Sequence, residues 1–146
     1  MGCRRFGAAW RLGCGCEGSV PSQTSGPQLA AQFGAQDAMA FIAKSGGLPA
    51  GCLAFDRFGE GMVELHRFFV DAAVRGQGIG RALMGAVLTE IDKDPARTVL
   101  IHTTFYMESA IAVYEAFGFT PCAPFRDTLA HVRHTDMFLS RASKGA

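Results

Sequence analysis

Apolar runs separated by glycine-rich turns divide the middle of the chain into strands and a helix. The runs at 38–44, 51–57 and 62–70 each have the length of a strand, and turns at 45–49 and 58–61 separate them. This spacing predicts three strands in antiparallel succession. In the next segment aliphatic residues recur every four positions, which predicts a helix with one buried stripe formed by Ile79, Leu83, Val87 and Ile91.

The remainder of the chain continues with a strand, a second helix and two further strands. The continuous apolar run at 98–103 is typical of a strand that is covered on both faces. Ser109 is placed to cap a helix over 110–117, and Gly118 is placed to end it in a left-handed conformation. The last strands are expected at 119–122 and 134–140.

The resulting order, β-β-β-α-β-α-β-β, predicts an α/β fold in which helices pack on a mixed sheet (α+β), with a parallel crossover around the first helix. Residues 1–36 have a different composition, rich in Gly, Ser, Gln, Ala and Cys, and they lack a regular period apart from one short helix expected over 28–36. We expect residues 1–36 to form an atypical, poorly ordered N-terminal segment and residues 37–142 to form the folded domain.

Composition narrows the functional classes. The 146 residues carry a net charge of +1, from 14 basic and 13 acidic residues, so no broad basic surface for nucleic acid or an anionic membrane is expected. No apolar run reaches the roughly 20 residues that span a bilayer. The five cysteines are odd in number and irregularly spaced, which favours reduced thiols in a cytoplasmic protein. Cys14 and Cys16 lack the further ligands that a metal site requires, so we expect no metal.

One glycine-rich stretch stands at the junction between the strand at 62–70 and the first helix. It reads Arg75-Gly76-Gln77-Gly78-Ile79-Gly80-Arg81. Glycines at alternate positions remove side chains, so consecutive backbone N–H groups can point to one anion at the N-terminus of the helix. The spacing fits neither the dinucleotide-binding motif G-x-G-x-x-G nor the P-loop. We therefore interpret the stretch as a cradle for a pyrophosphate, and a flexible turn without a ligand is the alternative.

The chain resembles the Gcn5-related N-acetyltransferase (GNAT) superfamily from about residue 38 to residue 141, on the strength of two motifs. Arg75, Gly78 and Gly80 match its signature of a basic residue or Gln, two residues, Gly, one residue, then Gly or Ala. Residues 110–119 resemble its A-x-x-x-Y-E-x-x-G-F helix. Both motifs follow in the order and at the separation that the superfamily has.

The resemblance implies an N-acetyltransferase with the GNAT-like acyl-CoA N-acyltransferase fold. The implied cosubstrate is acetyl-CoA, and the implied acceptor is a primary amine of a small molecule or a peptide. The backbone of Phe68, Phe69 and Val70 is then expected to pair with the pantetheine arm, where the central strand splays from its neighbour, and Gly76 to Arg81 are expected to bind the pyrophosphate. An oriented backbone N–H beside the thioester carbonyl would stabilise the oxyanion that forms as the amine attacks.

Two side chains are candidates for proton transfer. Tyr114 matches the tyrosine that protonates the departing CoA thiolate in many members, and a half-buried aromatic on the inner face of the helix is the alternative. Glu64 stands where some members have a general base, and a salt bridge with Arg67 or Arg57 is the alternative. The period of two places further side chains of this strand on the same face as Glu64: Met62, His66, Phe68 and Val70.

Three histidines enter no predicted site. His131 lies in the loop before the last expected strand and His134 begins that strand, without a carboxylate partner for a metal, and His102 is expected to line the end of the sheet.

The chain departs from the superfamily in its N-terminal part and at Met107. Residues 1–36 do not resemble the strand and helices that usually precede the meander and build one wall of the acceptor site, and an Asn that contacts the cofactor is common in place of Met107. A missing first strand would expose a sheet edge, so we expect either a partner chain, as in a homodimer, or the N-terminal segment to cover it. Two other functions stay open: a non-catalytic acyl-CoA-binding module or degenerate relative, and a structural domain that retains the fold.

Overall fold

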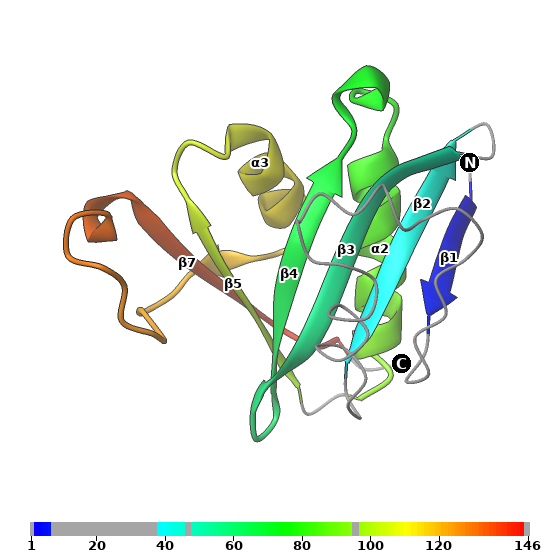
Figure 1. Ribbon diagram of the computed structural model, residues 1–146. Coiled ribbons are helices and arrows are strands. Elements are labelled where there is room, and N and C mark those ends of the chain that lie inside the picture. Colours follow the sequence, from blue (N-terminus) through cyan, green and yellow to red (C-terminus); the bar gives the residue numbers. More distant parts are fainter. Residues whose placement is uncertain (1, 7–37, 46–47, 95–96, 145–146) are drawn as a thin grey trace.

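The fold is one mixed sheet with two helices packed on it (Figure 1). The computed structural model describes residues 2–6, 38–45, 48–94 and 97–144. Within these residues the sheet has seven strands in the order β1-β2-β3-β4-β5-β7-β6. They are β1 (Gly2–Phe6), β2 (Met39–Ser45), β3 (Leu48–Gly59), β4 (Met62–Val70), β5 (Thr98–Thr104), β6 (Thr120–Pro121) and β7 (Asp136–Ala142). The helices are α2 (Ile79–Ile91) and α3 (Glu108–Ala116), and short 3₁₀ turns cover Ala72–Val74 and Arg133–Thr135.

The predicted antiparallel meander is confirmed, and β1 adds a strand to it. β2, β3 and β4 pair antiparallel in succession, and β3 extends beyond the expected 51–57 at both ends. β1 pairs antiparallel with β2 along its whole length, so the start of the N-terminal segment covers the edge of β2. The helix expected over 28–36 lies outside the described residues, and the domain boundary at residue 37 stays a prediction.

β4 and β5 are parallel neighbours over three residues only. Met62–Glu64 lie opposite Thr98–Leu100, which confirms the predicted parallel crossover through α2. Beyond these pairs β4 stays with β3 up to Val70, whereas β5 stays with β7 up to Thr104. The two strands therefore diverge toward their C-terminal ends, as Figure 1 shows. The splay that the resemblance implies is present.

A β-bulge interrupts β4 shortly after this divergence. β3 has one residue, Leu53, where β4 has two, Arg67 and Phe68. Arg67 has a left-handed φ of 57°, which is uncommon for a residue other than glycine. The extra residue shifts the alternation of side chains, so Phe68 packs against the same core as Leu65.

The bulge overturns one prediction about faces. A Cβ at Gly80 would lie 3.2 Å from Phe68 Cζ and 3.7 Å from Val70 Cγ2, so both side chains point toward α2. Glu64 and His66 precede the bulge and point to the opposite face. The prediction that Glu64 and His66 share a face with Phe68 and Val70 is wrong, because a period of two holds only along an unbroken ladder.

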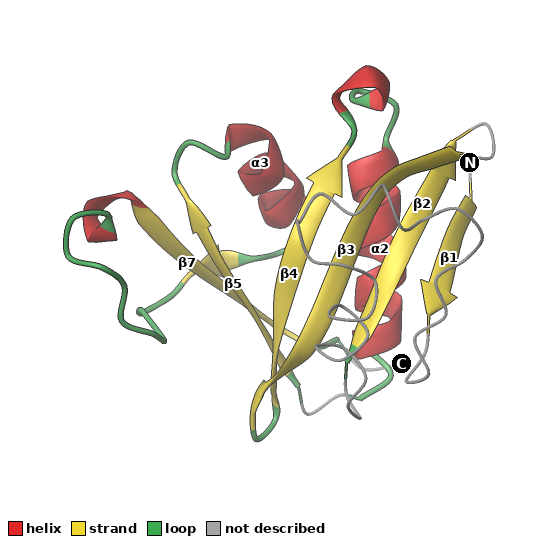
Figure 2. Ribbon diagram, viewed as in Figure 1, coloured by secondary structure: helices red, strands yellow, loops and turns green. Residues whose placement is uncertain are grey.

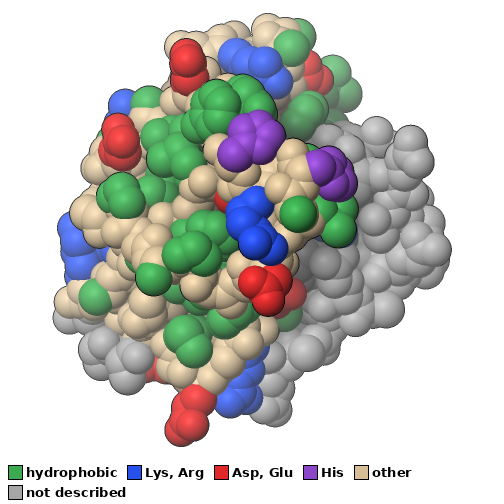
Figure 3. Space-filling model, turned by 90° about the vertical axis from the view of Figure 1, so that its left-hand side faces the viewer, with side chains coloured by type: hydrophobic (Ala, Val, Ile, Leu, Met, Phe, Trp, Pro, Cys, Tyr) green, Lys and Arg blue, Asp and Glu red, His purple; other side chains and the backbone are tan. Residues whose placement is uncertain are grey.

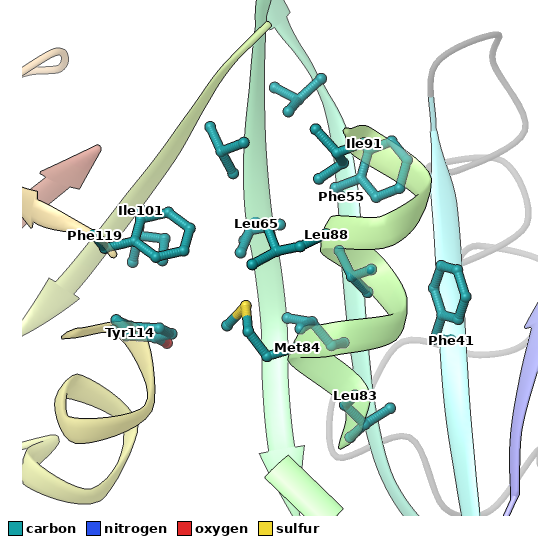
Figure 4. Close-up of a cluster of buried hydrophobic side chains, with 14 of the residues drawn as sticks. Phe41, Phe55, Leu65, Leu83, Met84, Leu88, Ile91, Ile101, Tyr114 and Phe119 are labelled. Carbon is teal, nitrogen blue, oxygen red and sulfur yellow. The ribbon is translucent and has the colours of Figure 1, made fainter. Parts of the chain in front are cut away.

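Both helices pack on the same face of the sheet and share one hydrophobic core (Figures 2 and 4). The four residues of the predicted α2 stripe are at most 1% exposed. Burying each such aliphatic side chain contributes about 1.5–3 kcal/mol before entropy is counted. The side chains that meet them from the sheet include Phe41, Phe55, Leu65 and Ile101.

The ends of α3 confirm one prediction and contradict another. Met107 is the N-cap, because the chain already turns after β5 with a 3.1 Å hydrogen bond from its N–H to the carbonyl of Thr104. Ser109 lies inside the helix, so its predicted capping role is wrong. Gly118 follows the helix with a φ of 88°, as predicted.

The last strand is tied to the end of α2. β7 begins at Asp136, later than predicted, because Arg133–Thr135 form a 3₁₀ turn. Near its C-terminal end Arg141 donates two hydrogen bonds, of 2.9 and 2.8 Å, to the carboxylate of Asp92 just after α2. This largely buried ion pair fastens the helix to the sheet.

Candidate active site

The loop between β4 and α2 presents a row of backbone N–H groups. Gly76 and Gly78 have left-handed φ angles of 80° and 81°, a conformation that glycine adopts without a steric penalty. From Gly76 to Arg81, no backbone N–H donates a hydrogen bond to any described residue, and the first helical bond runs from Ala82 to Gly78. A Cβ at either of the two left-handed glycines would meet no atom within 4 Å. The loop therefore has the geometry of an anion cradle at a helix N-terminus.

The other residues of the predicted cradle hold the loop in place and add charge. Arg75 Nε donates a 3.1 Å hydrogen bond to the carbonyl of Val70, which fastens the loop to the end of β4. Ile79 is 1% exposed and anchors the first turn of α2 in the core. Arg75, Gln77 and Arg81 are exposed, so two cationic side chains flank the row of N–H groups.

Phe68, Phe69 and Val70 form the last part of β4, beyond its pairing with β5. On that side their backbone has no strand partner among the described residues. On the other side β3 approaches closely, because a Cβ at Gly51 would lie 2.6 Å from the carbonyl oxygen of Phe69. The unpaired edge leads from the splay to the glycine loop, so an extended ligand can lie along it.

Tyr114 comes from α3 and closes the helix side of the splay. It is 6% exposed, and its ring centroid lies 5.7 Å from that of Phe68 and 6.1 Å from that of Phe119. In Figure 4 the ring extends from α3 toward β4. Its hydroxyl makes no hydrogen bond to the described residues but is not fully buried. Burial raises the pKa of Tyr114 to about 12, so the phenol is neutral at physiological pH.

Glu64 lies on the opposite face and is engaged in an ion pair. It is 4% exposed, and its Oε2 accepts a hydrogen bond from Nη2 of Arg126, which belongs to the segment before β7. His66 Nε2 lies 3.7 Å from the same oxygen. A salt bridge of Glu64 is therefore present, with Arg126 rather than with Arg67 or Arg57.

Two His–Asp pairs on this second face were not predicted. His66 Nε2 lies 2.7 Å from Asp56 Oδ1, and His102 Nε2 lies 3.0 Å from Asp136 Oδ1. Thr128 donates a hydrogen bond to the other oxygen of Asp136. The sequence signal for each histidine is a polar residue at an alternate position of an apolar strand. The partners are 10 and 34 residues away, so only the strand register reveals the pairs.

Other kinds of site find no support in the described part of the chain. No group of histidine, cysteine and acidic side chains there could hold a metal ion. None of its helices is long and apolar enough to cross a membrane. Cys52 and Cys122 are free thiols, and burial raises the pKa of Cys52 to about 11.

Comparison with known protein sequences places this chain in a family. The model of the acetyltransferase (GNAT) family matches residues 9–119. An IAA acetyltransferase of Azospirillum brasilense is 34% identical to this chain over 86 residues. That match covers 58% of this chain and 56% of the relative, so the chain spans little more than half of the relative's length.

Solved structures agree with the sequence comparison. A putative acyl-CoA N-acyltransferase of Klebsiella pneumoniae is 25% identical, with a TM-score of 0.65 over 74% of each chain. The IAA acetyltransferase of Bacillus cereus is 17% identical, with a TM-score of 0.69 over 96% of this chain and 97% of that one, which shows a shared fold. Since the family model matches most of this chain, the chain belongs to the acetyltransferase (GNAT) family.

Proposed function

We propose that this protein is an N-acetyltransferase that transfers the acetyl group of acetyl-CoA to a primary amine by direct attack. The observation that carries the proposal is the row of N–H groups from Gly76 to Arg81, which stands at the end of the unpaired edge of β4. Family membership supports acetyl-CoA as the cosubstrate and an amine of a small molecule or a peptide as the acceptor. The odd number and irregular spacing of the cysteines support a cytoplasmic location, where thiols stay reduced.

The donor would lie along β4 from the glycine loop to the splay. The N–H groups from Gly76 to Arg81 would bind the pyrophosphate, with Arg75 and Arg81 adding positive charge. The backbone of Phe68, Phe69 and Val70 would pair with the pantetheine arm and place the thioester at the splay. One oriented N–H beside the thioester carbonyl would stabilise the developing oxyanion by roughly 2.7–4 kcal/mol.

Tyr114 is the proposed acid that protonates the CoA thiolate. With a pKa of about 12, the phenol keeps its proton until the leaving group needs it. A thiolate in water, whose conjugate thiol has a pKa near 8.5, would take this proton only against roughly 5 kcal/mol. A thiolate that leaves inside the same water-poor site is itself more basic, because desolvation disfavours its charge as well.

Glu64 is the candidate base that the family pattern suggests. Its two contacts are both made by Oε2, and no described residue forms a hydrogen bond with Oε1. Oε1 could therefore take a proton from the ammonium form of the acceptor, directly or through water. The ion pair with Arg126 holds the carboxylate in place for this role.

The proposal is tested by measuring CoA binding calorimetrically and thiol release from acetyl-CoA with a panel of amines. We expect CoA to bind and one class of amines to be acetylated. Tyr114→Phe should keep CoA binding and lose at least about 100-fold in kcat. Tyr106→Phe is the matched control, because Tyr106 is 61% exposed, and it should behave as the wild type does.

Two outcomes would favour the other functions. CoA binding without turnover of any amine would support a non-catalytic acyl-CoA-binding module. A protein that does not bind CoA at all would contradict both the enzyme and the binding module.

A further inference from the structure

The two His–Asp pairs flank the point where β4 and β5 separate. Glu64 and Leu100 are the last residues that pair, and His66 and His102 each stand two positions further along their own strand. Each histidine is held through Nε2 by a carboxylate on the strand at its outer side, β3 for His66 and β7 for His102. The mouth of the splay therefore carries one oriented imidazole on each side.

His102 is held by two direct contacts. Its ring stacks on Phe138, with centroids 4.7 Å apart and planes inclined by 5°. Asp136, which accepts from Nε2, is itself fixed by the Thr128 hydroxyl, and hydrogen bonds from Thr128 and then His102 keep the pKa of Asp136 below its ordinary value. A carboxylate at Nε2 selects the tautomer with hydrogen on that nitrogen, so the lone pair of Nδ1 can accept a proton. The side chain is 22% exposed, so part of the ring is open to solvent.

His102 and Tyr114 lie on opposite faces of the sheet. Val99 and Ile101 of β5 are buried in the core under the helices. His102 directly follows Ile101, so the alternation of side chains along the strand places it on the other face. Tyr114 packs in the helix-side core. A thioester placed at the splay would have Tyr114 on one side and His102 on the other.

Glu64 has contacts that fit a structural role. Its partner Arg126 lies over two aromatic rings, 5.6 Å from the centroid of Phe58 and 5.4 Å from that of Phe125. These contacts fasten the segment before β7 onto the sheet. On the face that lies at the left of Figure 1, histidine side chains lie close to a Lys or Arg side chain among hydrophobic ones (Figure 3).

We propose that His102, in place of Glu64, is the base that accepts the proton of the acceptor ammonium, with Asp136 as the residue that positions it; this rests on the proposed acetyl transfer. One N–H bond of the ammonium breaks, the proton moves to Nδ1, and the electron pair stays on nitrogen. The neutral amine attacks the thioester carbon, the C–S bond breaks, and Tyr114 gives its proton to sulfur. The second proton lost from nitrogen returns Tyr114 to its neutral form, and the imidazolium releases its proton to solvent.

Charged groups on neighbouring elements affect the same step. Asp136 contacts the imidazole directly, and Arg133 acts on that carboxylate. Across the splay, Glu64 and His66 occupy the corresponding part of β4. The carboxylate of Asp136 stabilises the imidazolium that forms, as the aspartate does in other His–Asp pairs.

The test compares kcat/KM for the amine across a pH series in the wild type, His102→Gln and Asp136→Asn. His131→Gln is the matched control, because His131 is exposed in the segment before β7. We expect His102→Gln to lose about 100-fold or more at neutral pH, with CoA affinity unchanged. The loss should shrink as the pH rises, because more of the amine is then neutral in solution. Asp136→Asn should show a smaller loss with the same pH dependence.

A second comparison uses an acceptor that needs no base. An arylamine or hydrazine is largely neutral at pH 7, so His102→Gln should acetylate it nearly as fast as the wild type does. A merely structural role of His102 would slow both classes of acceptor equally, and that result would overturn the proposal. So would an unchanged pH profile in His102→Gln, or a loss confined to Glu64→Gln or His66→Gln. If the wild type acetylates no amine, the proposed function itself is overturned. Normal CoA affinity of the His102→Gln variant shows that its loss of turnover does not come from misfolding.

Discussion

Replacing Gly78 by alanine should cost a fixed free energy, which is divided between the stability of the protein and its affinity for CoA. Gly78 is the N-cap of α2 and has a φ of 81°. The new methyl group would meet no atom within 4 Å, so there is no clash to relieve. What remains is the penalty of the left-handed backbone for an L-residue, about 1–2 kcal/mol. Every state that keeps the turn has to bear this penalty.

The division of the penalty depends on the unliganded loop. If the loop keeps its conformation, the free energy of unfolding falls by the whole amount and the affinity for CoA is unchanged. If the loop relaxes, its N–H groups turn away and CoA has to restore them, so the Kd rises about 5- to 30-fold. In both cases the loss of stability and the loss of binding free energy add up to about 1–2 kcal/mol.

Urea denaturation and CoA calorimetry measure the two parts, and Gly85→Ala is the matched control. Gly85 lies inside α2, where a Cβ would be 3.9 Å from Phe117 Cε1, an ordinary contact. This variant should gain up to about 1 kcal/mol of stability and bind CoA normally. The reasoning would be refuted by a Gly78→Ala protein that matches the wild type in both measurements. A comparable loss of CoA affinity in Gly85→Ala would refute it too.

Three further predictions concern stability. Burial raises the pKa of Tyr114 from 10.0 to about 12, so the unfolded chain loses this proton at a lower pH than the folded protein does. As the pH rises from 10.0 to about 12, the wild type should therefore lose urea stability relative to Tyr114→Phe. Asp92→Asn should cost about 1.5–3 kcal/mol at neutral pH, because it weakens two hydrogen bonds to the buried Arg141. Since those bonds hold the pKa of Asp92 below its ordinary value, urea titrations should show this difference shrinking as the pH falls through the depressed folded pKa. Gly51→Ala should lower the free energy of unfolding by about 1–3 kcal/mol in the same assay, because its Cβ would overlap the carbonyl oxygen of Phe69. If any of these three variants matched the wild type in urea stability at every pH measured, the structure would be contradicted.

Elements that depend on local periodicity were predicted well. The α2 stripe and the strands of the meander follow from residues that are close in the sequence, and a single period describes each of them. The same holds for the glycine loop, since the need for a left-handed backbone at Gly76 and Gly78 is a property of those residues themselves. Boundaries were predicted less well. Ser109 has the chemistry of a cap, yet the turn after β5 begins α3 before it.

The candidate site was only partly predictable, for two physical reasons. A one-residue bulge at Arg67 moves Phe68 and Val70 to the other face, and its presence depends on how β3 pairs with β4. The partners of Glu64 and His102 are 62 and 34 residues away, so no local spacing indicates them.

By itself, the sequence determined the order of the strands and helices from residue 38 onward and the backbone of the glycine loop, because both arise from interactions between near neighbours; the added strand β1 was seen only in the structure. It also identified the family through two local motifs. The tertiary structure decided which side chains face each other across the splay: Tyr114 from the helix side, and Glu64, His66 and His102 from the other. The physical reason is that strand register, and with it the face of every side chain, is set by pairing between distant segments.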